Sequence, residues 1–600
     1  MREYSVPVLV DVPATACLTD TVFERAEQEP GKVVMRRNEG DGWSAVTAGE
    51  FRDQVAALGK ALMAAGVEHG DRVALMSRTR YEWTLIDYAI WSIGGVTVPV
   101  YETSAPDQVA WILSDSDAKA VFTETAAHEE TVREAAPGLK HLWRVDTPPD
   151  GSAFPALDGS AVDDAAFAER RARVTAADLA TIVYTSGTTG RPKGCRITHD
   201  NLLFTARNVL WGPLEPLFRA KDPAALLFLP LAHIFARMIQ VVFVEAGAVM
   251  AHTPNMKNVA PDLQDFKPTF LLGVPRVFEK VYNGAEQKAV AGGKGKIFAR
   301  AAEVAVAWSK AEGSGGAGFG LRLQHALFDR LVYAKLRAAT GGRLAAAVSG
   351  GSALGERLGH FFRGVGIEVF EGYGLTETSA PCSVNMPGAN KIGTVGKPLP
   401  GVTLRIAGDG EILTRGRNLF EGYWGNDAAT AEAIDAEGWY HTGDVGELDA
   451  DGYLRITGRK KEILVTAAGK NVAPGPLEDA LRAHPLISQA MIVGDGRPFV
   501  GALITLDPEA LAQWAPAGGP VPTDPAGLRA DPRVLAEVQG AVDRANVLVS
   551  KAEQIKKFTV LAADLTEESG HLTPTLKIKR NLVTRDFGAE IEDLYGGRRG

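Results

Sequence analysis

A run of hydroxyl, glycine and lysine residues follows an apolar, strand-like stretch at residues 181–194, TIVYTSGTTGRPKG. Glycines let the backbone turn sharply and present successive N–H groups, which together form a concave site for an anion. Hydroxyl side chains add further donors, and a lysine adds a full positive charge. The alternative is a polar turn without a ligand. The pattern favours a phosphate-binding loop made by Thr185, Ser186, Gly187, Thr188, Thr189, Gly190 and Lys193.

This loop differs from the Walker pattern of nucleotide hydrolases. The Walker pattern has four residues between its first glycine and a Gly-Lys-Ser/Thr unit. Here Arg191 and Pro192 separate Gly190 from Lys193, and Lys193 is followed by Gly194. Pro192 also removes a backbone donor. We therefore expect phosphate contact through a different and more mobile loop, and the spacing excludes a P-loop NTPase.

A second stretch, VFEGYGLTETSAP (369–381), combines glycines, an aromatic residue and an acid. Gly372 and Gly374 would let a planar ligand approach the backbone, and Tyr373 can stack on a base. Glu377 is a hard oxygen ligand of the kind that Mg²⁺ takes. A generic turn with a surface glutamate is the alternative. The stretch therefore indicates a nucleotide and metal site.

Two further stretches place charges close to turns. In GWYHTGDVGELDADGYLRITGRKK (438–461), Asp444 can accept both hydroxyls of a ribose, and Arg459 can reach the same sugar or the phosphates. Taken alone, Asp444 would be a hairpin-turn residue. In HLTPTLKIKRNLV (571–583), Lys577 lies in a loop-like context, and without other information a solvated basic surface would be the preferred interpretation.

These four stretches, in this order, resemble the signatures of the adenylate-forming superfamily, which includes acyl-CoA synthetases, luciferases and peptide-synthetase adenylation domains. The resemblance extends over residues 45–585. It implies ATP, Mg²⁺ and coenzyme A as ligands, with Mg²⁺ on Glu377 and Thr185. It also implies a catalytic or phosphate-contacting role for Lys577, Lys193, Thr376, Glu377 and His233. The nucleotide site implied in the same way adds Gly350, Gly351, Ser352, Glu371, Gly372, Tyr373, Gly374, Asp444 and Arg459.

The resemblance also implies a moving C-terminal domain. Lys461 takes the position of the hinge, and rotation about it would bring Gly469 and Lys470 toward the thiol tunnel. The residue before Lys577 is glycine in many relatives, and Leu576 is similar to the long-chain fatty acyl-CoA synthetase branch. His233, in LPLAHIFARM (229–238), resembles the histidine near the acyl carboxylate, with a pocket-shaping role. No counterpart of the family's aromatic gate is identified.

Composition sets the broad class. The chain has 600 residues, 46% of them hydrophobic, so at least two domains are expected. A net charge of −9 argues against a nucleic-acid-binding surface. Three widely spaced cysteines fit a reducing compartment. The N-terminal run lacks a signal-peptide pattern and residues 224–252 carry charges. A cytoplasmic protein without a transmembrane segment is expected, and a lipid substrate would allow peripheral contact at the inner membrane face.

Periodicity predicts an α/β fold. Short β-branched runs at 72–77, 94–101, 119–124 and 179–186 alternate with helical patterns such as 48–66, which indicates doubly wound, mostly parallel sheets. The loop 313–320 contains G-x-G-x-x-G after a helical pattern, so a dinucleotide site is rejected. We expect an N-terminal domain over 1–460, with a β-subdomain at about 396–460, and a smaller mobile α+β domain over 461–600.

The function implied by the resemblance is a long-chain fatty acid:CoA ligase that forms AMP. A fatty acid, ATP and CoA are the expected partners. Two alternatives stay open: a fatty acyl-AMP ligase that loads a carrier protein, and a phosphotransferase or nucleotide sensor that uses the same loop. The sequence does not predict the acyl chain length or the oligomeric state.

Overall fold

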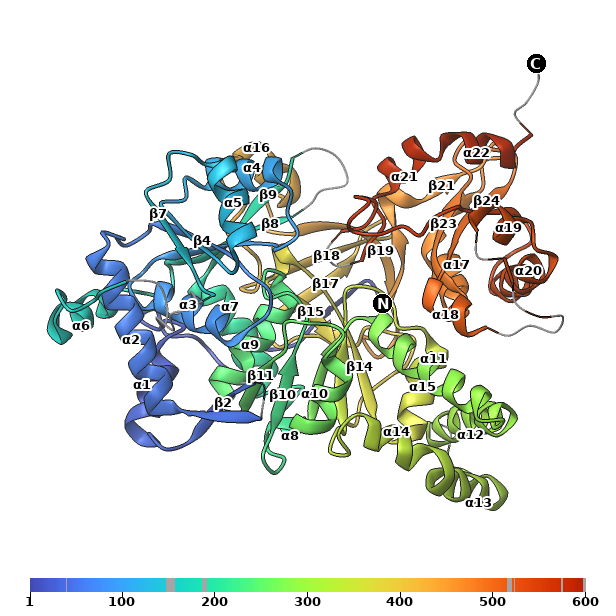
Figure 1. Cartoon of the computed structure of the whole chain (residues 1–600), viewed down its shortest axis with the longest axis horizontal. Coiled ribbons are helices and arrows are strands. Elements are labelled where there is room, and N and C mark those ends of the chain that lie inside the picture. The colour runs from blue at the N-terminus through green and yellow to red at the C-terminus, as the bar shows by residue number, and fades with distance from the viewer. Residues whose placement is uncertain are drawn as a thin grey trace.

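The computed structural model of the chain describes residues 1–38, 40, 42–146, 157–185, 191–313, 315–514, 519, 521–522, 524–573 and 576–596. Its strands form mixed and parallel sheets with helices packed around them (Figure 1). The predicted α/β class is confirmed.

A six-stranded sheet is formed by strands from residues 72–198, with the order β7-β6-β4-β5-β8-β9. Its inner strands are apolar on both faces, as parallel strands covered by helices must be. β9 alone runs antiparallel, because a hairpin joins it to β8. The strands are β4 (Arg72–Met76), β5 (Val96–Val100), β6 (Ala120–Thr123), β7 (His141–Arg144), β8 (Leu179–Thr185) and β9 (Lys193–Thr198). Helices α2 (Ala48–Ala64), α4 (Pro106–Ser116), α5 (Ala126–Ala135) and α6 (Asp164–Ala172) belong to the same region.

The second sheet has nine strands in the order β16-β15-β14-β13-β12-β10-β11-β2-β3. Its centre is parallel, and antiparallel strands complete both edges. The strands are β2 (Val33–Asn38), β3 (Trp43–Thr47), β10 (Ala224–Leu227), β11 (Val249–His252), β12 (Phe270–Gly273), β13 (Ala346–Ser349), β14 (Glu368–Leu375), β15 (Ala380–Val384) and β16 (Lys397–Pro398). The helices of this half include α1 (Asp20–Gln28), α10 (Val259–Phe266), α11 (Pro275–Ala291), α12 (Gly295–Glu312) and α15 (Glu356–Val365). The loop at 313–318 follows α12, so the rejection of a dinucleotide fingerprint is confirmed.

Two almost fully buried helices, α3 (Tyr81–Ser92) and α9 (Ile234–Ala246), join the sheets. Trp91 of α3 donates from Nε1 to the carbonyl oxygen of Ala180 in β8, at 2.8 Å. The guanidinium of Arg237 in α9 forms a fully buried ion pair with Asp87 of α3. A buried charge pair is stable only when further hydrogen bonds satisfy it, and Thr97 provides one by donating to Asp87 Oδ1 at 2.7 Å.

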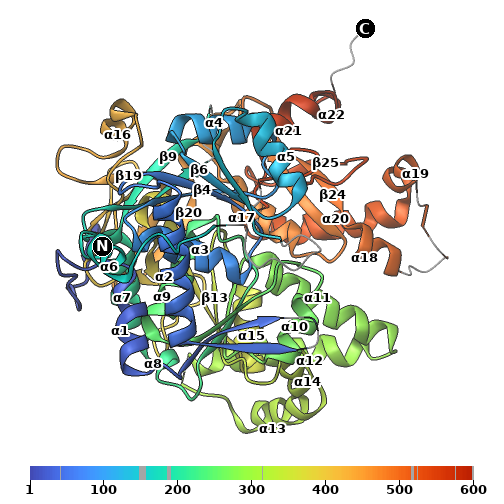
Figure 2. The same ribbon diagram turned by 60° about the vertical axis from the view of Figure 1, so that its left-hand side comes forward.

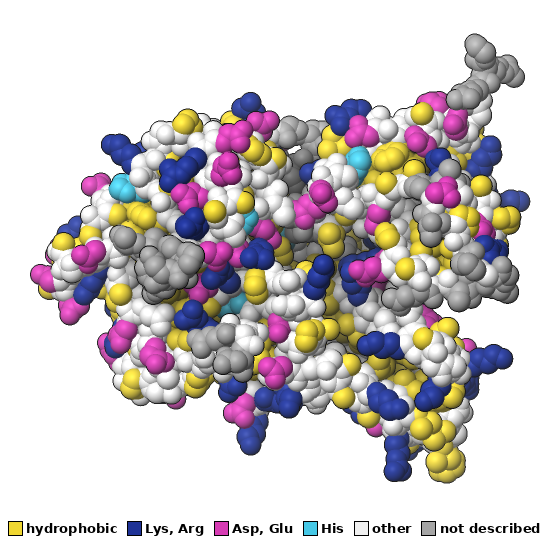
Figure 3. Space-filling model, in the orientation of Figure 1, with side chains coloured by type: hydrophobic (Ala, Val, Ile, Leu, Met, Phe, Trp, Pro, Cys, Tyr) yellow, Lys and Arg dark blue, Asp and Glu magenta, His cyan; other side chains and the backbone are white. Residues whose placement is uncertain are grey.

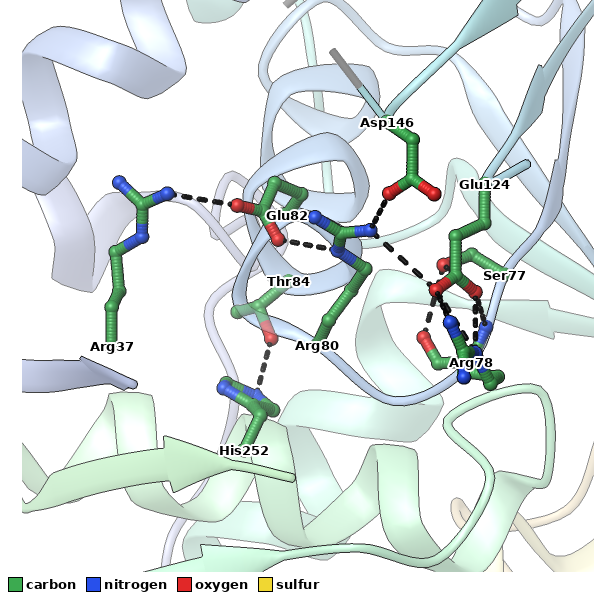
Figure 4. A network of polar contacts seen from close by, with 9 residues as sticks. All are labelled: Arg37, Ser77, Arg78, Arg80, Glu82, Thr84, Glu124, Asp146 and His252. Atoms are coloured by element: carbon green, nitrogen blue, oxygen red, sulfur yellow. Dashed lines mark hydrogen bonds and ion pairs between the residues drawn. The ribbon is translucent and has the colours of Figure 1, made fainter. Parts of the chain in front are cut away.

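Charged side chains at the end of β4 and the start of α3 form a second polar network (Figure 4). Arg78 holds the buried carboxylate of Glu124 through several bonds of 2.6–3.1 Å. Arg80 Nε donates to Glu82 Oε2 at 2.6 Å, and Arg37 of β2 donates to the other oxygen at 3.0 Å. Burial disfavours the charged form of Glu124, but the bonds from Arg78 outweigh it and lower the pKa of this carboxyl. The network fixes the loop between β4 and α3 and ties it to the nine-stranded sheet.

A twisted antiparallel sheet covers one end of these layers. Its strands are β17 (Val402–Ile406), β18 (Glu411–Gly416), β19 (Tyr440–Leu448) and β20 (Leu454–Arg459). Hairpin turns connect β17 to β18 and β19 to β20, whereas a longer segment that contains a helix connects β18 to β19. The Gly-Asp-Gly and Asp-Gly turns that predicted hairpins lie between these strands. The sequence did not predict that β1 (Glu3–Ser5) adds to this sheet by pairing with β17.

Residues after 461 form a separate α+β layer (Figure 2). Its three-stranded sheet has the order β23-β24-β25 and its own apolar core. The strands are β23 (Ile487–Val493), β24 (Val500–Leu506) and β25 (Ile555–Val560), and a small ribbon joins β21 (Leu464–Val465) to β22 (Asn471–Val472). The helices are α17 (Pro474–Arg482), α18 (Pro508–Gln513), α19 (Pro525–Ala530), α20 (Pro532–Asn546), α21 (Arg580–Asp586) and α22 (Gly588–Leu594).

Candidate active site

Most of the predicted site residues surround one cavity of about 2100 Å³. The carboxyl ends of β8, β13 and β14 open into it, which is where open α/β sheets bind ligands. The segment around Lys577 closes it from the side of the C-terminal layer. The predicted residues on its wall are Thr185, Lys193, His233, Gly350, Gly351, Gly372, Tyr373, Gly374, Thr376, Glu377, Arg459, Lys461 and Lys577.

The predicted phosphate loop connects β8 to β9. Thr185 and Lys193 are directly paired across this hairpin, so both lie at the base of the loop. The rest of the loop, comprising Ser186, Gly187, Thr188, Thr189 and Gly190, lies outside the described residues. A Walker loop leads into a helix, whereas this loop leads into an antiparallel strand. The rejection of a P-loop NTPase is therefore confirmed.

Glu377 follows β14 in a short 3-10 helix, Thr376–Thr378. Its Oε1 accepts a hydrogen bond of 2.9 Å from the hydroxyl of Tyr423, and the ammonium of Lys193 lies 4.6 Å from the centre of the Tyr423 ring. Within the described parts of the chain, the structure gives Oε2 of Glu377 no protein donor. A half-buried carboxylate with one oxygen oriented and the other open to the cavity fits a hard divalent cation.

Sequence reasoning missed Tyr423. It lies 46 positions from Glu377 in the chain and belongs to none of the four stretches. Burial and the neighbouring Glu377 raise the pKa of its hydroxyl far above the ordinary value, so Tyr423 is a hydrogen-bond donor at any working pH. The signal that could have found it is the aromatic pair Tyr423-Trp424 between glycines, although this pattern has no specific function by itself.

Glycines shape the part of the wall made by β13 and β14. A side chain at Gly350 would lie within 2.9 Å of the Phe235 ring, and one at Gly374 would lie within 1.8 Å of the Ala380 carbonyl oxygen. Gly374 therefore has no room for a side chain, and a side chain at Gly350 would displace the Phe235 ring. Glu371 is buried behind this wall, where its Oε1 accepts from the Leu354 N–H at 2.8 Å. Burial raises its pKa to about 7.

Asp444 and Arg459 meet across β19 and β20, where they are directly paired in register. Asp444 Oδ1 accepts from Arg459 Nε at 2.7 Å, and Oδ2 accepts from the hydroxyl of Tyr373 at 2.7 Å. Asp444 therefore lies inside a strand, and the hairpin-turn interpretation is wrong. The three side chains form one polar group at the edge of the cavity, on the side of the antiparallel sheet.

Lys577 lies in a tight loop ahead of α21. Leu576, just before it, has a φ of 62°, in the left-handed region that favours glycine. Arg580 anchors the loop, because its Nη2 donates to Glu478 Oε2 at 2.5 Å. Lys577 lines the cavity, where loss of bulk solvation and, to a smaller extent, the charge of Arg459 lower its pKa.

His233 caps the N-terminus of α9, where its Nδ1 accepts from the Phe235 N–H at 3.2 Å. Burial, and then the nearby charge of Lys577, lower the pKa of His233 to about 4. The imidazole is therefore neutral at physiological pH. Arg237, one turn further along, does not reach the cavity wall, because it is paired with Asp87.

Some predicted residues lie away from the cavity wall. Gly469 and Lys470 form the exposed turn between β21 and β22, and Lys470 Nζ lies 3.5 Å from Glu553 Oε1. Ser352 is exposed beside the wall. The roles predicted for these residues remain predictions.

One side of the cavity is apolar. It is lined from α7 (His199–Leu210), the loop after it and α9 by Val209, Leu214, Met238, Ile239 and Val242. These side chains lie next to His233, so an apolar compartment adjoins the polar one that contains Glu377 and Lys577. Ligand pockets commonly combine an apolar lining with a few polar groups that orient the ligand.

The site and fold define an adenylate-forming enzyme, and the comparisons agree. The family model described as "AMP-binding enzyme" matches residues 22–424, and the model described as "AMP-binding enzyme C-terminal domain" matches 461–599. The chain belongs to the AMP-binding enzyme family.

Comparison with individual proteins gives more specific similarities. The chain is 49% identical to the long-chain-fatty-acid–CoA ligase FadD15 of Mycobacterium tuberculosis, over 99% of this chain and all of the relative. Among solved structures it resembles the anthranilate CoA ligase AuaEII in complex with anthranoyl-AMP, with a TM-score of 0.72, 20% identity and coverage of 97% and 99%. It also resembles the O-succinylbenzoate coenzyme A synthetase of Bacillus subtilis in complex with ATP and magnesium, with a TM-score of 0.65, 20% identity and coverage of 94% and 98%.

Proposed function

We propose that this protein is a long-chain fatty acid:CoA ligase that forms an acyl-adenylate from ATP and then transfers the acyl group to CoA. The observation that carries the proposal is the single cavity in which the polar group around Glu377 and Lys577 adjoins the apolar wall of α7 and α9. FadD15, which this chain matches over almost its whole length, is named as a long-chain-fatty-acid–CoA ligase. The fatty acid would place its chain along the apolar wall and its carboxylate near His233.

In the first half-reaction, the carboxylate attacks the α-phosphorus of ATP and pyrophosphate leaves. Because two anions repel each other as they approach, the site must neutralise both. Lys577 would bridge the carboxylate and an α-phosphate oxygen, while Lys193 and the loop 185–190 would hold the departing phosphates. Magnesium, when bound, would neutralise phosphate charge, with Glu377 and Thr185 as its protein contacts.

The nucleoside would be held by the remaining polar groups. Asp444 presents carboxylate oxygens oriented by Tyr373 and Arg459, and such a carboxylate can accept hydrogen bonds from ribose hydroxyls. The base would lie against the glycine-containing stretches after β13 and in β14, where Gly350, Gly351, Gly372 and Gly374 line the cavity.

In the second half-reaction, residues 461–600 would rotate about Lys461, withdraw Lys577 and bring Gly469 and Lys470 toward the cavity. The turn that carries Gly469 and Lys470 would move with this domain, and the CoA thiol would then attack the acyl carbonyl of the adenylate and release AMP. The domain boundary at 460–461 and the mobility of the smaller domain are parts of this proposal.

The test is AMP formation from ATP with a panel of acids from C6 to C18, with and without CoA. We expect AMP release to require both a fatty acid and CoA, and ATP–pyrophosphate exchange to require the fatty acid alone. Formation of ADP would instead indicate a phosphotransferase. Release of AMP only with a carrier protein would indicate a fatty acyl-AMP ligase.

A cytoplasmic location with peripheral contact to the inner membrane face belongs to the same proposal. Among the helices of the described residues, none combines the length and the apolar character needed to cross a membrane. A fatty acid partitions into bilayers, so an enzyme that uses it benefits from binding at the membrane surface.

A further inference from the structure

Helix α13 (Phe319–Phe328) and the π-helical turn that follows it, Asp329–Tyr333, present large apolar side chains to solvent. The exposed fractions are 79% for Phe319, 57% for Leu323, 56% for Leu327 and 47% for Leu331. These four residues are spaced four apart and therefore share one side of the helix. We call them the outer face of α13. Soluble proteins rarely expose apolar residues in such a continuous row.

The opposite side of α13 contacts α12 and the C-terminal end of α15 through His325. The ring of His325 stacks on Trp308 of α12 with the centres 4.1 Å apart, and its Nε2–H donates to the Gly364 carbonyl oxygen at 2.7 Å. Tyr333 is buried, and its hydroxyl donates to the Ala301 carbonyl oxygen at 2.6 Å. The apolar row therefore belongs to the surface of the folded chain.

Basic residues surround the outer face. The segment 275–343 contains twelve lysines and arginines against five acidic residues, although the whole chain has a net charge of −9. Arg322 and Arg330 are exposed and are adjacent in the chain to Leu323 and Leu331 of the apolar row. Neither forms an ion pair with any residue that the structure describes. Figure 3 shows apolar and basic side chains together at this lower right end of the molecule.

We propose that the outer face of α13 docks the protein onto an anionic lipid bilayer. Helices that lie in a membrane interface combine an apolar side that enters the acyl boundary with basic residues that meet anionic headgroups. The helix lies at the outer edge of the molecule in both Figure 1 and Figure 2, so a flat surface can reach it. The docking proposal depends on the proposed ligase function in one respect only: the function explains why docking is useful, since it gives access to a fatty acid dissolved in the membrane.

A second copy of the chain fits this face less well. A symmetric pair would place the outer face against itself, which would bring Arg322 and Arg330 of the two copies together. Like charges would then oppose association, whereas a layer of lipid phosphates would neutralise both arginines. Charge complementarity therefore favours the bilayer.

The test uses the full chain and vesicles of phosphatidylcholine with phosphatidylglycerol, compared with phosphatidylcholine alone. We expect sedimentation with the anionic vesicles only, and release at high salt. The double variant L323S/L327S should bind at least about tenfold more weakly, because both leucines lose their contact with the acyl boundary. Neutralising each arginine, as in R322Q or R330Q, should weaken binding about fivefold.

The matched control is V547S/L548S, which removes two other exposed apolar side chains, next to α20. It should bind vesicles like the wild type. All variants should form acyl-CoA normally from a water-soluble acid in the absence of vesicles. Vesicle binding is measured without substrates. The docking proposal can therefore be tested even if the protein proves to lack ligase activity.

Three outcomes would overturn the docking proposal. One is a wild-type protein that does not sediment with anionic vesicles. Another is equal loss of binding in L323S/L327S and in the control. The third is a wild-type dimer in light scattering that L323S/L327S converts to a monomer, which would make the outer face a contact between chains.

Discussion

Removing the hydroxyl of Tyr423 should weaken magnesium-dependent adenylation without disturbing the fatty acid site. Tyr423→Phe keeps the ring that faces Lys193 at 4.6 Å and removes only the 2.9 Å bond to Glu377. Groups that orient a metal-binding side chain typically change metal affinity or activity by about 10–100-fold. That range corresponds to about 1.4–2.7 kcal/mol. We expect the lower end, because Glu377 is half-buried and water can partly replace the hydroxyl.

The assay is ATP–pyrophosphate exchange with a fatty acid, titrated with Mg²⁺ at saturating ATP. The half-saturating Mg²⁺ concentration should rise about tenfold, while the KM for the fatty acid stays unchanged. Tyr81→Phe is the matched control, since it removes a hydroxyl bonded to Gln54 at 2.9 Å, away from the cavity. An unchanged Mg²⁺ dependence in Tyr423→Phe would refute the role of Tyr423 in positioning Glu377.

Three other variants test the site and the core. Lys577→Ala should abolish adenylate formation in pyrophosphate exchange but leave thioester formation from supplied acyl-AMP largely intact, and equal losses would contradict its role. Because the pKa of Lys577 lies below its ordinary value of 10.5 and its ammonium is the working form, wild-type adenylation should fall on the alkaline side before pH 10.5. For Glu371, the folded pKa of about 7 exceeds the unfolded value of 4.5, so its stabilising contribution is complete below pH 4.5 and lost as pH rises through 7. Glu371→Gln should therefore raise the free energy of unfolding above pH 7 by about 3 kcal/mol, and a variant no more stable than wild type in urea at pH 8 would contradict this. Asp87→Asn leaves Arg237 buried without its partner and should cost about 3–5 kcal/mol in the same measurement, with a loss below about 1 kcal/mol contradicting the geometry.

The local parts of the fold could be predicted from the sequence. Strand β8 and the glycines of β14 are specified by residues that are neighbours in the chain, because apolar runs and glycine turns act over a few positions. The resemblance then connected the four stretches, which no periodicity could do. The assigned roles of Lys577 and Asp444 are still predictions, although both side chains lie at or beside the cavity.

The parts that could not be predicted depend on contacts between distant segments. Asp87 and Arg237 are 150 positions apart, and neither lies in a pattern that indicates a buried pair. Tyr423 reaches Glu377 only because the turn before α16 (Asp427–Ala433) folds back onto the hairpin of β8 and β9. Such pairings require the three-dimensional arrangement, since a single sequence contains no record of them.

The pairing of β1 with β17 has a consequence for synthesis of the chain on the ribosome. Ser5 and Thr403 are partners although 398 positions separate them. At roughly 5–20 residues per second, the partner strand emerges about 20–80 s after β1. During that time the edge of β1 lacks its native partner and is open to other strands. The antiparallel sheet that holds Asp444 and Arg459 is thus completed late, and the nascent chain needs protection until then.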